Sequence, residues 1–64
     1  MARGKIETLT REIQIRENLN SMRQVFELYP YLGELYYKEK QGKDIDPADF
    51  KEDIYKKKKN LLLD

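Results

Sequence analysis

The side chains that most enzymes use for proton transfer or nucleophilic attack are scarce in this sequence. None of its 64 residues is His, Cys or Trp. The commonest general base, the commonest metal ligand and the thiolate nucleophile are therefore missing. The hydroxyl side chains of Ser21, Thr8 and Thr10 have only carboxylates or lysines to activate them. Because so short a chain rarely encloses a preorganised pocket, we expect a protein that is not an enzyme, with no cofactor.

An acidic stretch at residues 44–53 has a superficial likeness to a calcium-binding loop. The glycine that such a loop requires at its sixth position is missing, Ala48 replaces an oxygen ligand, and Tyr55 stands where the closing Glu belongs. Asp46 followed by Pro47 is instead typical of a helix start, with Asp46 as the N-cap. Helix capping explains these acids, and the sequence predicts no metal site.

Four consecutive lysines, residues 56–59, form the most basic stretch. Together with two basic residues near the N-terminus, they could contact nucleic-acid phosphates. The plainer interpretation is a solvated helix end, where positive charge complements the helix dipole. The chain carries 13 basic and 12 acidic residues, whereas nucleic-acid-binding proteins usually have a marked basic excess. Nucleic-acid binding is therefore the alternative function, and its candidate phosphate contacts are Arg3, Lys5, Lys56, Lys57, Lys58 and Lys59.

Tyrosines are frequent for a chain of this length, and four of the five lie close to Pro30. In helical projection Tyr31 and Tyr37 fall off the apolar face, so at least one of them should be exposed. Exposed tyrosine is typical of binding hot spots, although single surface aromatics are also common. The leucines near the C-terminus also lack an obvious internal partner. The candidate partner-binding residues are Tyr31, Tyr37, Leu62 and Leu63.

The apolar periodicity predicts a long first helix from about Thr8 or Thr10, either of which could cap it, to Tyr29. Its expected core seam has apolar residues spaced by three and four, with polar residues on the opposite face. Two ion pairs at i,i+4 spacing are expected, Glu12 with Arg16 and Arg23 with Glu27. The seam consists of Ile15, Leu19, Met22, Phe26 and Tyr29, with Val25 beside it.

A second apolar stripe, formed by Ile6, Leu9 and Ile13, points well over 100° away from that seam in a straight helix. Two explanations are open. The helix could break near residue 13, so that its first turns fold back on the same core. The stripe could instead meet a different partner, such as a second copy of the chain. Ile6, Leu9 and Ile13 are therefore the candidate self-association residues.

Two further helices are expected after the first. Pro30 should kink the chain and start a short second helix that ends near Gln41, before Gly42. The third helix should begin after Asp46 and bury a face that includes Phe50. The predicted fold is an all-α, three-helix arrangement, which dimerisation could complete. Residues 1–64 form one domain, with residues 1–5 as a flexible basic arm.

The combined pattern favours an interaction module, with regulation or inhibition of a larger protein as its expected role. A protein partner and a homodimer are the expected associations, with nucleic acid as the less favoured one. No apolar run approaches the length of a signal peptide or a membrane span, so we expect no membrane association and a cytoplasmic location.

Overall fold

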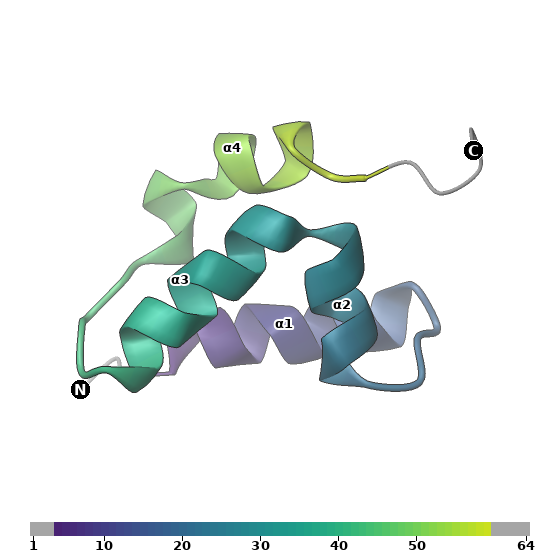
Figure 1. Ribbon diagram of the computed structural model, residues 1–64, viewed down its shortest axis with the longest axis horizontal. Coiled ribbons are helices and arrows are strands. Elements are labelled where there is room, and N and C mark those ends of the chain that lie inside the picture. The colour runs from purple at the N-terminus through teal and green to yellow at the C-terminus, as the bar shows by residue number, and fades with distance from the viewer. Residues whose placement is uncertain (1–3, 60–64) are drawn as a thin grey trace.

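The fold is all-α, as the apolar periodicity predicted. The computed structural model describes residues 4–59, which form four α-helices and one 3-10 turn. Three of the helices, α1 (Lys5–Arg16), α2 (Met22–Leu28) and α3 (Pro30–Lys40), pack against one another, and the fourth, α4 (Lys51–Lys56), lies against α3. Figure 1 shows α3 crossing in front of α1, with α2 at one end of the pair and α4 along the other side of α3.

The start of α1 is capped by a side chain from a distant helix. The backbone N–H groups of Ile6 and Glu7 donate to the two carboxylate oxygens of Glu39, at 3.0 and 3.3 Å. A carboxylate here satisfies free helix donors and complements the positive end of the dipole. The prediction of a threonine cap is wrong, because α1 begins before both threonines. It also includes Lys5, which the sequence had suggested to be part of a flexible arm.

The first helix ends well before the predicted position. Asn18 has a φ of 57°, in the left-handed region that Asn tolerates better than most residues. Its N–H donates to the carbonyl of Ile15 at 3.1 Å, and the N–H of Leu19 donates to the carbonyl of Gln14 at 2.9 Å. This pair of bonds is the Schellman motif, which commonly ends helices. One continuous helix to residue 29 is therefore wrong, because the chain turns at Asn18 before α2 begins.

The predicted break at Pro30 is confirmed. α2 and α3 meet at the single residue Tyr29, and Pro30 takes the first position of α3, where its missing N–H is not needed. At the other end of α3, Gly42 has a φ of 100° and donates its N–H to the carbonyl of Glu39 at 3.0 Å. Gly42 is therefore the helix stop that the sequence predicted.

The predicted third helix is divided into two parts. A 3-10 turn, η1 (Pro47–Asp49), precedes α4, and Phe50 lies between them. The Asp46 cap is confirmed, since its carboxylate accepts the N–H of Ala48 at 3.0 Å. The cap therefore starts the 3-10 turn. α4 ends at Lys56, whereas the sequence predicted that the whole lysine run would lie in the last turns of the third helix.

The core is made by all four helices and the loop before η1. Thr10 is the one buried polar residue in the described part of the chain, and its hydroxyl donates to the carbonyl of Ile6 at 2.8 Å. The buried apolar residues are Ile6, Ile13, Val25, Tyr29, Leu32, Leu35, Ile45 and Ile54.

The turn at Asn18 explains how two apolar stripes that point in different directions can occur in this part of the sequence. Ile6 and Ile13 have no exposed surface, and Leu9 packs partly buried against the core. Ile15, the first residue of the expected seam, is 81% exposed. The predicted seam is therefore wrong at its start. α1 buries the stripe that contains Ile6 and Ile13, and α2 contributes Val25 to the same core.

Candidate interaction surfaces

The stripe expected to mediate self-association lies inside the single chain. Ile6 and Ile13 are fully buried, and Leu9 is partly covered. These side chains have partners within the chain, because α1 ends early enough to fold them onto α2 and α3. Pairing two copies through Ile6 and Ile13 would require α1 to leave its own core.

A group of polar and aromatic side chains gathers where the end of α1 meets the joint between α2 and α3. The hydroxyl of Tyr29 donates to the carboxylate of Glu17, and Lys58 Nζ lies 3.6 Å from the other oxygen of that carboxylate. Burial, followed by the hydrogen bond to Glu17, raises the pKa of Tyr29 to about 12. The ring of Tyr55 meets the ring of Tyr29 edge-on, with 5.6 Å between their centroids. We call Glu17, Tyr29, Tyr55 and Lys58 the tyrosine cluster.

Arg16 leaves its predicted partner and joins this cluster. Its Nη2 donates to the hydroxyl of Tyr55 at 3.1 Å, and its Cζ lies 5.8 Å from the centre of the Tyr55 ring. The hydrogen bond to Tyr55 raises the pKa of the Arg16 guanidinium. Among the ion pairs of residues 4–59, none joins Arg16 to Glu12, whereas the predicted pair of Arg23 and Glu27 forms at 3.6 Å.

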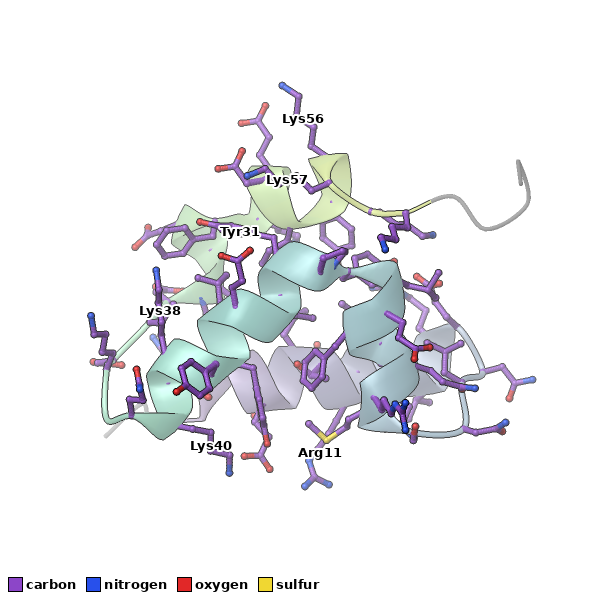
Figure 2. The ribbon with its side chains drawn as sticks, in the orientation of Figure 1. Arg11, Tyr31, Lys38, Lys40, Lys56 and Lys57 are labelled. Atoms are coloured by element: carbon purple, nitrogen blue, oxygen red, sulfur yellow. The ribbon has the colours of Figure 1, made fainter. Side chains whose placement is uncertain are left out.

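The lysine run attaches the segment after α4 to the helices beneath it. Lys57 Nζ lies 4.6 Å from the centre of the Tyr31 ring, and Lys58 Nζ lies 5.4 Å from that of Tyr29. The backbone N–H of Lys59 donates to the carbonyl of Leu28 at 2.8 Å. Figure 2 shows Lys57 beside Tyr31, with Lys56 pointing away from the fold. Two of the four lysine side chains, those of Lys57 and Lys58, therefore make internal contacts.

The remaining predicted phosphate contacts are not gathered with this run. Lys5 Nζ lies 3.7 Å from a carboxylate oxygen of Asp46, in the loop before η1. In Figure 1, the start of α1 and the end of α4 lie on different sides of the fold. Arg3 lies outside the described residues. Arg16, which the sequence had placed in a helical ion pair, instead contacts Tyr55, the residue before the run.

The two candidate tyrosines of α3 have different surroundings. Tyr31 is partly buried between Lys57 and Phe50, whose ring centroid lies 6.2 Å from its own. Tyr37 is 65% exposed. The other two candidates, Leu62 and Leu63, lie outside the described residues. Tyr37 belongs to a face that points away from the core, formed at helical spacing by Glu34, Tyr37 and Lys38 of α3 and by Gln41, the residue after its end. We call these four residues the outer face of α3.

The tyrosine cluster was missed because its members come from four separate segments. Glu17 follows α1, Tyr29 joins α2 to α3, Tyr55 belongs to α4, and Lys58 follows it. The one local signal was Asn18, followed by Leu19, Asn20 and Ser21, a run of residues typical of a helix end and a new start. A break placed there would have put Arg16 and Glu17 at the end of the first helix.

The acidic stretch makes ordinary protein contacts. Asp46 caps η1 and pairs with Lys5. No group of acidic side chains within residues 4–59 is arranged to hold a metal ion. In the same part of the chain, no helix combines the length and apolar character needed to cross a bilayer.

Comparison with known protein families, curated proteins and solved structures gives no match to this chain.

Proposed function

We propose that this chain is a non-enzymatic helical module that binds a larger protein and regulates or inhibits it. The observation that carries the proposal is the outer face of α3. All four of its side chains are exposed, and Tyr37, the aromatic residue among them, is 65% exposed. Tyrosine gives a large contact area at a low entropic cost, which is why it is frequent among the residues that dominate binding energy.

The rigidity of α3 supports the same proposal. Its opposite side is fixed in the core by Leu32 and Leu35, and its ends are defined by Pro30 and Gly42. A face on a fixed helix loses little conformational freedom when a partner binds. The cytoplasm is the proposed compartment, because the chain lacks the cysteines with which small secreted domains are usually cross-linked.

The polar groups of the tyrosine cluster support a role without catalysis. The Glu17 carboxylate already accepts the Tyr29 hydroxyl and pairs with Lys58. These contacts give Glu17 a structural role, in which it holds the end of α1 against the joint of α2 and α3.

The experiment compares two exposed apolar residues on different helices. Full-length wild type, Tyr37→Ser and Ile15→Ser are immobilised, and the proteins that each retains from cell extract are quantified by mass spectrometry. We expect wild type and Ile15→Ser to retain the same defined protein. Tyr37→Ser should retain about tenfold less of it. Both variants should melt like wild type, because neither side chain is in the core. Equal retention by all three proteins would contradict the proposal.

A further inference from the structure

Arg16 is an exposed guanidinium held in a fixed orientation. It lies at the end of α1, yet its hydrogen bond goes to Tyr55, 39 positions further along the chain. Its carbon centre also lies 5.8 Å from the middle of the Tyr55 ring. A guanidinium has five N–H donors in one plane, and Tyr55 accepts from one of its nitrogens. No salt bridge of the described residues includes Arg16.

Lys58 brings a second positive charge to this part of the surface from the other end of the chain. It lies over Tyr29, whose ring contacts that of Tyr55. Lys58 is already paired with Glu17 at 3.6 Å, so Arg16 is the cation of this group that has no carboxylate partner among the described residues.

We propose that Arg16 binds a carboxylate of an acidic segment in the partner protein. The planar guanidinium can take a carboxylate through two parallel N–H donors, a geometry that a lysine cannot provide. Its contact with Tyr55 fixes this donor plane before the partner arrives, which lowers the entropic cost of binding. This inference rests on the proposed function and adds the chemistry of the partner.

A short acidic peptide fits this surface better than a nucleic acid does. The whole chain is almost neutral, so it lacks the long-range field that draws proteins to a phosphate backbone. A partner with a few carboxylates needs no such field, because a single carboxylate can take two parallel N–H donors of Arg16.

The probe is a fluorescein-labelled peptide of eight glutamates, and its binding to the full chain is followed by fluorescence polarisation at low and at physiological salt. We expect Arg16→Gln to weaken binding about tenfold, because charge-assisted hydrogen bonds are lost. Arg16→Lys should recover only part of the loss. The matched control is Arg23→Gln, which removes the same charge from an exposed arginine already paired with Glu27, and it should bind like wild type.

Three outcomes would overturn the inference. The first is no binding of the glutamate peptide by wild type at low salt. The second is an equal effect of Arg16→Gln and Arg23→Gln, which would mean that the peptide responds only to total charge. The third is tighter binding of a single-stranded DNA octamer that also depends on Arg16, which would favour the nucleic-acid alternative. The proposed function is judged separately: loss of a retained protein with Tyr37→Ser supports it even if the glutamate peptide does not bind.

Discussion

Tyr29 links three helices through a single side chain. It occupies the joint between α2 and α3, its ring is buried, and its hydroxyl donates to Glu17 just beyond α1. Lys58 then covers the ring from the segment after α4. The sequence placed Tyr29 correctly in the core and at the kink. It did not reveal the hydroxyl's partner, because Glu17 was expected in the middle of a continuous helix.

The buried hydroxyl of Tyr29 predicts a loss of stability at alkaline pH. The ordinary pKa of the phenol is 10.0, and burial with the bond to Glu17 raises the pKa of Tyr29 to about 12. Between these values the folded chain keeps a proton that the unfolded chain has lost, so the free energy of unfolding should fall as the pH rises from about 10 to 12. Urea denaturation across this range measures the fall.

Two variants separate this effect from the titration of the lysines. Tyr29→Phe removes the hydroxyl and should show a shallower decline over the same pH range, although it is less stable near neutral pH because Glu17 loses its donor. Tyr37→Phe removes an exposed hydroxyl and should keep the decline of the wild type. If Tyr29→Phe and wild type decline in parallel, Tyr29 is not the group responsible.

At the scale of the helices, local signals predicted the ends that depend on neighbouring residues. Pro30, Gly42 and the Asp46 cap all act where the sequence placed them. The end of α1 was missed because asparagine also occurs inside helices and so does not mark an end by itself. The apolar spacing also continued past Asn18 without interruption. The start of α1 could not be read locally, because its cap is Glu39, more than 30 residues away.

The Glu39 cap predicts a measurable link between α1 and α3. Glu39→Ala should lower the free energy of unfolding by about 0.5–2 kcal/mol, the usual range for loss of an N-terminal capping side chain. The matched control is Glu34→Ala, a change of the same type on the exposed face of α3. It should shift the denaturation midpoint little. Equal midpoints for the two variants would show that Glu39 does not stabilise α1.

At the scale of the whole molecule, the predicted apolar stripe is buried within the single chain. Ile6 and Ile13 fill the space between α1, α2 and α3, and Ile54 closes the core from α4. The tyrosine cluster then joins the end of α1 to the segment after α4. The sequence identified the apolar stripe but could not say what covers it, because that depends on where the chain turns.

The same substitution two residues apart in α1 tests this arrangement. Ile13 is fully buried and Ile15 is 81% exposed. A domain of this size is stabilised by roughly 3–10 kcal/mol. Ile13→Glu loses apolar burial and forces a carboxylate toward the core, a combined cost of that order. We expect Ile13→Glu to lose its helical circular dichroism signal, whereas Ile15→Glu should keep the spectrum and melting temperature of the wild type.

Light scattering of the wild type and both variants at two concentrations then identifies what Ile13 packs against. Because Ile13 belongs to the chain's own core, its loss should unfold the protein whatever the oligomeric state of the wild type. If Ile13 instead paired two copies, Ile13→Glu would give a folded species of half the wild-type mass. A helical, half-mass Ile13→Glu protein would therefore restore the self-association surface and contradict the burial of α1 against α2 and α3.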